Sequence, residues 1–326
     1  MNEKLSDRLS VVMYHYVREI KSSRYPGIKG LERSDFIQQL KFFQKNFHVV
    51  TMEHVLAYYE FGEKLPEKAL LLTFDDGYAE HFTQVYPILK EFNMQGSFYI
   101  PAMTVEESKV LDVNKIHFIL SECADPARIV LKIHELILNY QEEYQLRDFD
   151  AYYQELAVAN RFDTAEVIFI KRILQHGLPE TLRGIITDIL FEEFMGIDET
   201  AFSKELYMNK YQLSQMLSDG MHIGCHGYNH YWWDKLNSEQ LQEEIDKSNE
   251  FLSGLGVDSD NWTACYPYGS HNREVVQLLE ERGCKLAFTT EVDSADLKAR
   301  NRLLLPRLDT NDFEPKSNNY MKLIPI

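Results

Sequence analysis

The sequence predicts an α/β fold, a distorted (β/α) barrel of about seven or eight parallel strands with a helical insertion. Three observations predict it. Short β-rich apolar runs recur along the chain, amphipathic helical segments lie between them, and one long interval has helical patterning without a strand. The number of runs favours a closed barrel, and an open doubly wound sheet is the alternative.

Eight apolar runs mark the predicted strands. They lie at residues 9–14, 48–51, 69–74, 96–100, 221–226, 262–266, 286–290 and 303–307. The run ALLLTF at 69–74 shows no alternation, as expected for a strand buried on both faces of a parallel sheet. Among the helices between the runs, Ser34 is the predicted N-cap of an early one, and Gly283 is predicted to follow the end of a late one.

One long interval, residues 101–220, contains no convincing strand. Segments such as ARIVLKIHELILNY and ETLRGIITDILFEEF have apolar residues three and four apart, which is typical of packed helices. We therefore predict a barrel formed by residues 1–103 and 206–326, with a helical insertion at 104–205. The histidines of this interval are expected to be solvated or packed in the core rather than to bind a ligand; they are His117, His134 and His176.

Composition and charge exclude several classes of partner. The 34 Lys and Arg against 51 Asp and Glu give a net charge of −17, which disfavours nucleic acid and anionic membranes. No apolar run reaches the roughly 18 residues of a membrane span. The first residues lack the basic end and long apolar stretch of a signal peptide, and the four cysteines form no CxxC pair. We expect a cytoplasmic, reducing location.

Two acidic residues directly follow a predicted buried strand. Asp75 and Asp76 come after ALLLTF, where adjacent carboxylates repel and each needs a proton, a cation or several donors. The same Asp-Asp-Gly run is also a good exposed turn, and that interpretation stays open from these residues alone.

Two histidines follow another predicted strand. The run MHIGCH leads into His226 and His230, and Gly227 disfavours a helix through this pair. One carboxylate and two imidazoles form a three-ligand set for a divalent ion with a position left open. The second carboxylate would be free to take a proton from water bound to that ion. The turn Tyr266–Gly269 after a third strand offers backbone N–H groups to an oxyanion, although alone it is simply a turn.

Together these motifs resemble those of the polysaccharide deacetylase family, the NodB-homology group or carbohydrate esterase family four. They are TFDDG at 73–77, HGYNH at 226–230 and YPYG at 266–269, in this order and at strand ends. The resemblance covers residues 9–103 and 206–310 and leaves out the helical insertion. It implies a distorted (β/α) barrel that hydrolyses an N-acetyl group on an amino sugar and releases acetate.

The resemblance also implies a role for each matching residue. Asp75 resembles the family's catalytic base. The metal ligands would be Asp76, His226 and His230, binding Zn²⁺ or, in some members, Co²⁺, Ni²⁺ or Fe²⁺. The backbone N–H of Tyr268 resembles the donor that stabilises the oxyanion.

This chain departs from the family pattern at two places. Many members have an arginine where this chain has Cys265, and Arg307 is the predicted substitute that orients the base; an ordinary salt bridge from Arg307 to a helix is the alternative. The late histidine that acts as general acid in many members is missing. His15 and His271 are the two candidates, and each could instead be a polar loop residue.

The predicted function is a metal-dependent deacetylase acting on an N-acetylated sugar, either a polysaccharide or a glycan precursor. Two alternatives remain. One is hydrolysis of another small amide or imide, and the other is a catalytically weak barrel that binds carbohydrate.

Overall fold

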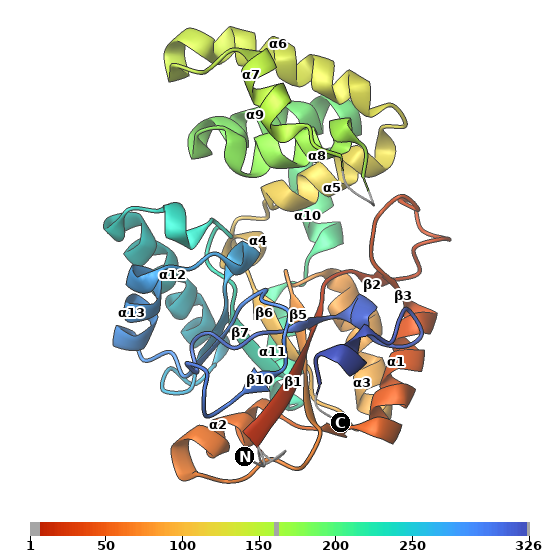
Figure 1. Ribbon diagram of the computed structural model, residues 1–326, viewed down its shortest axis with the longest axis vertical. Helices are drawn as coiled ribbons and strands as arrows, with labels where there is room; N and C mark the ends of the chain where they lie inside the picture. The colour runs from red at the N-terminus through yellow and green to blue at the C-terminus, as the bar shows by residue number, and fades with distance from the viewer. Residues whose placement is uncertain (1–6, 160–162, 325–326) are drawn as a thin grey trace. The chain divides into compact units, whose positions relative to one another are not determined.

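The computed structural model describes residues 7–159 and 163–324. The chain divides into two compact units. The first comprises Met1–Glu19, Gly30–Ser108 and Lys204–Ile326, and the second comprises Ile20–Lys29 and Lys109–Ser203. Figure 1 shows strands in the first unit and helices in the second.

The first unit is built around one curled sheet. Its strands are β1 (Arg8–Tyr14), β4 (His48–Val49), β5 (Ala69–Asp75), β6 (Ser97–Ile100), β7 (His222–Cys225), β8 (Thr263–Cys265), β9 (Leu286–Phe288), β10 (Ala295–Asp296) and β11 (Leu308–Asp309). The main order is β10-β1-β5-β6-β7-β8-β9, and every pair except β1–β10 is parallel. The predicted distorted (β/α) barrel is confirmed. A parallel ribbon of β2 (Val17–Arg18) and β3 (Leu31–Glu32) lies outside this sheet.

The last predicted strand, at 303–307, is wrong as a continuous strand. Leu305 forms a single parallel bridge with Phe288 of β9, and the ladder resumes only at β11, which pairs with β1. Pro306 lies between these contacts and has no N–H to donate, which explains the interruption. The segment 305–309 therefore contacts both β9 and β1 and closes the ring irregularly.

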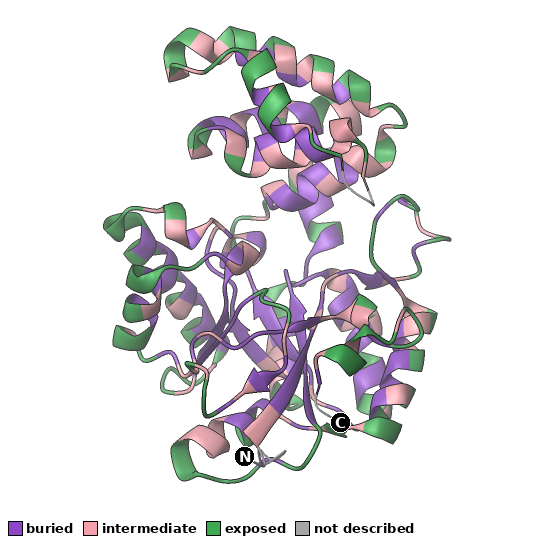
Figure 2. Cartoon of the chain, in the orientation of Figure 1, coloured by how far each residue is buried: buried purple, intermediate pink, exposed green. Residues whose placement is uncertain are grey.

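Helices cover the outside of this sheet. They are α1 (Arg33–Asn46), α2 (Met52–Phe61), α3 (Tyr86–Glu91), α4 (Ala102–Glu106), α11 (Lys210–Ser218), α12 (Ser238–Leu255) and α13 (Arg273–Glu281). Figure 1 shows β1, β5, β6 and β7 between α1 and α3 on one side and α12 and α13 on the other. All seven residues of β5 are buried, as expected for a strand covered on both faces, and Figure 2 shows the strands buried and the outer helix faces exposed.

Helix ends agree only in part with the sequence prediction. Helix α1 begins at Arg33 with Glu32 as its N-cap, so the assignment of Ser34 as the cap is wrong. The chain passes directly from β3 into the helix, which places Ser34 inside the first turn. Gly283 follows α13 with a φ of 77°, a left-handed conformation that suits glycine after a helix end.

The second unit is helical. Its helices are α5 (Asp112–Glu122), α6 (Pro126–Tyr144), α7 (Phe149–Leu156), α8 (Ala165–Arg172) and α9 (Glu180–Met195), and α10 (Glu199–Leu206) crosses the boundary at 203. Helix α6 buries Ile129, Ile133, Leu136 and Ile137 at spacings of three and four. Residues 20–29 belong to this unit, and the Tyr25 ring packs on the edges of Phe118 and Phe202.

Among the described residues, no helix is long and apolar enough to cross a membrane.

Candidate active site

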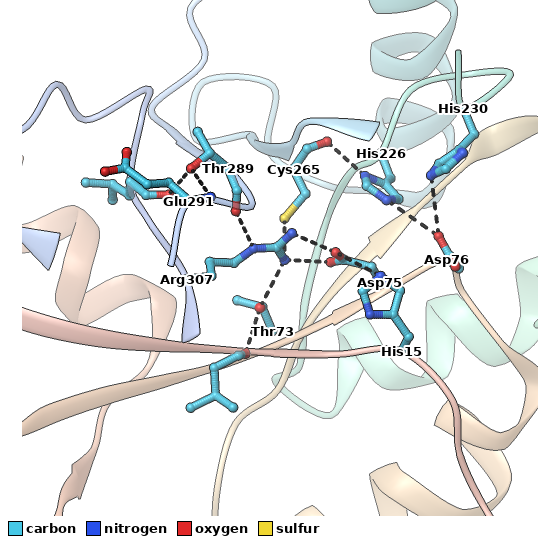
Figure 3. Close-up of polar contacts among 12 residues, drawn as sticks. His15, Thr73, Asp75, Asp76, His226, His230, Cys265, Thr289, Glu291 and Arg307 are labelled. Carbon is cyan, nitrogen blue, oxygen red and sulfur yellow. Dashed lines mark hydrogen bonds and ion pairs between the residues drawn. The ribbon is translucent and has the colours of Figure 1, made fainter. Parts of the chain in front are cut away.

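The residues predicted to carry the chemistry gather at one end of the barrel (Figure 3). Asp75 is the last residue of β5, Asp76 follows it, and His226 directly follows β7. Arg307 lies on the closing segment. Because the carboxyl ends of parallel strands meet at the same edge, residues far apart in sequence converge there.

Asp75 forms a bidentate ion pair with Arg307. The guanidinium Nη1 and Nη2 donate to Oδ1 and Oδ2 at 2.9 and 2.8 Å, and both side chains are almost fully buried. Burial alone would disfavour the charged carboxylate, but the positive charge of Arg307 outweighs it and lowers the pKa of Asp75 to about 2. Asp75 is therefore ionised at neutral pH.

Other contacts fix the guanidinium in place. Nε of Arg307 donates to the Thr289 carbonyl at 2.9 Å, and Nη1 lies 3.2 Å from both Thr73 Oγ1 and Cys265 Sγ. The structure thus brings Arg307 to the carboxylate rather than to a helix. Cys265, the position at which arginine was expected from the resemblance, is among the residues that contact this guanidinium.

Asp76 faces the two histidines. Its Oδ1 lies 3.5 Å from His226 Nε2 and 3.6 Å from His230 Nε2, and Tyr78 donates its hydroxyl to Oδ2 at 2.5 Å. Oδ1 is buried and accepts no hydrogen bond from the residues that the structure describes. Burial disfavours the charge, but the neighbouring imidazoles hold the pKa of Asp76 well below its usual range.

Hydrogen bonding orients the first imidazole. His226 Nδ1 lies 2.8 Å from the Cys265 carbonyl, so Nδ1 donates to that carbonyl and Nε2 is directed toward Asp76. Burial lowers the pKa of His230 to about 3, which keeps that ring neutral. A neutral imidazole is the form that binds metal.

These three side chains fit a divalent ion. One carboxylate oxygen and two ring nitrogens lie within 4.8 Å of one another, and all three residues are buried. Oδ1 of Asp76, which accepts no hydrogen bond from the described residues, is the oxygen that would coordinate such an ion. Two imidazoles and one carboxylate suit Zn²⁺ and leave a coordination position for substrate or water.

The backbone at this end of the barrel is strained. Asp76, His230 and Tyr268 have φ values of 72°, 61° and 58°, in the left-handed region that non-glycine residues seldom adopt. Each costs roughly 1 kcal/mol or more. Such strain persists where the surrounding structure imposes it, and it clusters at functional sites.

The turn that carries Tyr268 is held by aromatic packing. Its ring lies 4.5 Å from Trp232 with an interplanar angle of 5°, and 4.7 Å from the ring of His230. Gly269 follows with a φ of 71°, and a Cβ there would lie 2.1 Å from Thr290 Oγ1. The conformation of the turn that carries the Tyr268 N–H is thereby fixed.

The two candidate acids are placed differently. His15 Nε2 lies 3.8 Å from Asp75 Oδ2, and its side chain is 43% exposed. His271 is exposed, and its Nδ1 lies 2.8 Å from the Gly269 carbonyl of its own turn. His15 therefore lies next to Asp75, whereas His271 hydrogen-bonds within the turn that contains Gly269.

Three supporting residues were missed by the sequence prediction. Tyr78 donates to Asp76, buried His81 binds the His15 carbonyl through Nε2 at 2.8 Å, and Glu244 accepts hydrogen bonds from the loop between the two histidines. Tyr78 and His81 could have been noticed from their position just after TFDDG. Glu244 lies in a charged stretch, and its spacing from Leu241 on the same helix is the one signal for it.

Comparison with protein families gives one match. The chain matches the polysaccharide deacetylase model over residues 62–124 and 188–287, together half of its length.

Two curated proteins are similar over shorter stretches. The chain is 39% identical over 83 residues to the poly-β-1,6-N-acetyl-D-glucosamine N-deacetylase of Escherichia coli strain K12, which is 25% of this chain and 12% of that protein. It is 28% identical over 94 residues to the putative polysaccharide deacetylase YxkH of Bacillus subtilis strain 168, which is 28% of this chain and 32% of that protein. The chain thus matches less than a third of the length of either relative.

Solved structures are similar over nearly the whole chain. The Streptococcus pyogenes deacetylase PplD in complex with acetate aligns with a TM-score of 0.59 and 16% identity, covering 98% of this chain and 99% of that one. IcaB from Ammonifex degensii aligns with a TM-score of 0.55 and 19% identity, covering 95% of each chain. At these identities the likeness concerns the fold.

Proposed function

The chain belongs to the polysaccharide deacetylase family, and from this premise we propose that it hydrolyses the N-acetyl group of an amino-sugar residue. The observation that carries the proposal is the pair of adjacent buried carboxylates with different partners. Asp75 is neutralised by Arg307, whereas Asp76 keeps an oxygen without a donor and faces two imidazoles. Two carboxylates in such different surroundings suit two different roles.

Asp75 is the proposed general base. Its low pKa keeps it ionised, and the two hydrogen bonds from Arg307 fix the orientation of the carboxylate. It would accept the proton of the attacking water while that water adds to the acetyl carbon. Because the ion pair holds the carboxylate before substrate arrives, no side chain has to reorganise during this step.

Asp76, His226 and His230 are the proposed ligands of a divalent ion, with Zn²⁺ the first candidate. When bound, such an ion would polarise the acetyl carbonyl and lower the pKa of the water. The backbone N–H of Tyr268 would donate to the carbonyl oxygen as negative charge develops there; the ring of the same residue packs against His230.

His15 is the proposed general acid. Its side chain is partly exposed, and its Nε2 lies 3.8 Å from Asp75 Oδ2 (Figure 3). It would donate a proton to the amine nitrogen as the C–N bond breaks, so that acetate and the free amino sugar leave.

We propose N-acetyl-D-glucosamine residues of a polysaccharide or glycan precursor as the substrate. Support comes from the name of the Escherichia coli relative, an N-deacetylase of a β-1,6-linked polymer of this sugar. The net charge of −17 is compatible with a neutral substrate and a cationic product. The cytoplasmic location stays a prediction.

The function is tested by acetate release. Purified protein loaded with Zn²⁺ is incubated with β-1,6- and β-1,4-linked N-acetylglucosamine oligosaccharides and with cyclic imides. We expect acetate from the oligosaccharides. Turnover of imides alone would indicate the amide or imide alternative, and a metal-loaded protein without any turnover would indicate a binding protein.

Two substitutions separate the proposed roles. Asp76→Ala should lose both metal and activity, whereas Asp75→Asn should keep the metal and lose about 10²- to 10⁴-fold in kcat. Asp150→Asn, at an exposed helix position, is the matched control and should leave both unchanged. Full activity of Asp75→Asn would remove the base assignment, and a wild type that binds no divalent ion would remove the metal site.

A further inference from the structure

A buried carboxylate lies behind the loop that carries the two histidines. Glu244 projects from α12 and is 3% exposed. Its oxygens accept the backbone N–H groups of Tyr228 and Asn229, both at 3.1 Å, and the side-chain amide of Asn229. Two successive N–H groups directed at one anion form a compact anion-binding turn.

The other side of the same loop is also held. The carbonyls of Gly227 and Tyr228 accept the N–H groups of Ala102 and Met103, at 3.1 and 3.0 Å, where α4 begins. The loop is therefore bound by α12 through the N–H groups of Tyr228 and Asn229, and by α4 through the carbonyls of Gly227 and Tyr228. A loop held on both sides keeps a fixed path between His226 and His230.

A glycine leaves room for this contact. Gly227 has a φ of 76°, and a Cβ at this position would lie 3.2 Å from both Glu244 Oε2 and Trp233 Nε1. A side chain there would crowd both groups, in addition to the strain of the left-handed backbone. Glycine at this position therefore lets the carboxylate lie against the loop.

Within residues 7–159 and 163–324, no Lys or Arg forms a salt bridge with Glu244. Burial raises the pKa of Glu244, and the amide groups of Tyr228 and Asn229 together with the Trp233 side chain oppose that rise. Burying an unpaired carboxylate is costly, and N–H donors offset the cost only if they stay in place. Loop and carboxylate therefore hold each other in one geometry.

We propose that Glu244 is a positioning residue that sets the separation and direction of His226 and His230 for metal binding. The inference rests on the metal site of the proposed function. In the part of the chain that the structure describes, Glu244 forms no hydrogen bond with either imidazole; it acts through the path of residues 227–229. Supporting contacts of this kind typically change metal affinity or activity about 10- to 100-fold when removed.

The test measures metal affinity directly. Zn²⁺ dissociation constants are obtained by competition with a chromophoric chelator for the wild type and for Glu244→Gln. The amide keeps the shape but offers one acceptor where the carboxylate offers two, and its NH₂ would face the loop N–H groups. We expect Glu244→Gln to bind Zn²⁺ about 10- to 100-fold more weakly.

A spectroscopic readout separates positioning from plain stability. In the Co²⁺-loaded protein, a shift of the imidazoles should change the visible absorption bands of Glu244→Gln, and Glu244→Asp should lie between it and the wild type. Glu243→Gln is the matched control, since Glu243 is its exposed neighbour paired with Lys247, and it should match the wild type in both measurements. Circular dichroism of the metal-free variants establishes that they fold.

Two outcomes overturn the inference. A folded Glu244→Gln with wild-type Zn²⁺ affinity and an unchanged Co²⁺ spectrum would overturn it alone, including when the variant melts at a lower temperature. If the wild type binds neither ion, the metal site of the proposed function fails as well. Should Glu244→Gln not fold, Glu244→Asp decides by the same two measurements.

Discussion

Both units of the chain bury charged side chains, but the partners of these side chains differ. In the helical unit, Lys115 is 5% exposed and forms ion pairs with both Asp188 and Glu199, with Nζ 2.7 Å from the latter. In the barrel, Asp75 is likewise neutralised by Arg307. Next to it, however, Asp76 keeps a buried oxygen that accepts no hydrogen bond from the described residues.

This difference distinguishes buried charges that stabilise the fold from buried charges that form a binding site. A buried charge with all its partners stabilises one packing arrangement, and its removal affects folding. A buried carboxylate oxygen that accepts no hydrogen bond and faces two ring nitrogens indicates a place where a cation can bind. Substitutions in the two units should therefore have different readouts.

The largest effect is expected from Arg307→Met. Without the guanidinium, Asp75 loses the largest influence that opposes burial, so its pKa should rise from about 2 and the base should lose charge as pH falls. We expect kcat/KM to fall about 10²- to 10³-fold and its acid limb to move to higher pH. Arg307→Lys keeps a charge without the bidentate geometry and should lie between. An acid limb unchanged in Arg307→Met would contradict the role given to the ion pair.

The matched change in the helical unit is Lys115→Met. Asp188 and Glu199 would lose their partner, but both are partly exposed and water can compensate in part. We expect the free energy of unfolding to fall by about 2 kcal/mol. Chemical denaturation measures this, and Zn²⁺ affinity of the folded variant should stay at the wild-type value. A loss of Zn²⁺ affinity in folded Lys115→Met would contradict the claim that these ion pairs affect stability alone.

A smaller effect is expected from acid on the metal-free barrel. Burial lowers the pKa of His81 from 6.5 to about 4. Between these two pH values His81 is therefore protonated in the unfolded chain but not in the folded chain. Stability should therefore decrease as pH falls through this window, by about 1.4 kcal/mol at pH 5.5 relative to pH 7.5 from this residue. Denaturation of wild type and His81→Gln at both pH values, with chelator present, gives the difference. An equal loss in both proteins would mean that His81 is not the group responsible.

The smallest effect is expected at the surface. Arg282 forms two hydrogen bonds to Asp246, at 2.7 and 3.0 Å, between α13 and α12, and both side chains are partly exposed. Solvent screens such a pair, so Asp246→Asn should change the free energy of unfolding by no more than about 0.5 kcal/mol. A value comparable to that of Lys115→Met would show that burial does not decide the effect of these ion pairs.

The parts of the site that were predictable are local in sequence. Asp75 and Asp76 are adjacent, and His226 and His230 are separated by three residues, so each pair could be assigned to one strand end. The Arg307 contact spans 232 positions. Its residue type and strand-end position indicated a role, but only the curvature of the sheet decides which carboxylate it meets.

The parts that were not predictable depend on side-chain direction. His15 and His271 both lie near strand or turn ends, and nothing in their sequence surroundings separates the one that meets Asp75 from the one that binds its own turn. Glu244 lies in SEQLQEEIDK, a charged stretch that resembles a solvated helix face. Only its spacing from Leu241 and Ser248, both buried, indicates that it faces inward.

The irregular closing segment has a consequence for biosynthesis. Translation yields Asp75, Asp76, His226 and His230 before Arg307, and β1 obtains its partner β11 only after that. A nascent chain that stops short of residue 303 would carry every proposed metal ligand while its base lacks a counter-ion. The same segment thus closes the ring and brings Arg307 to Asp75. An unfinished chain could therefore bind metal without being an active hydrolase.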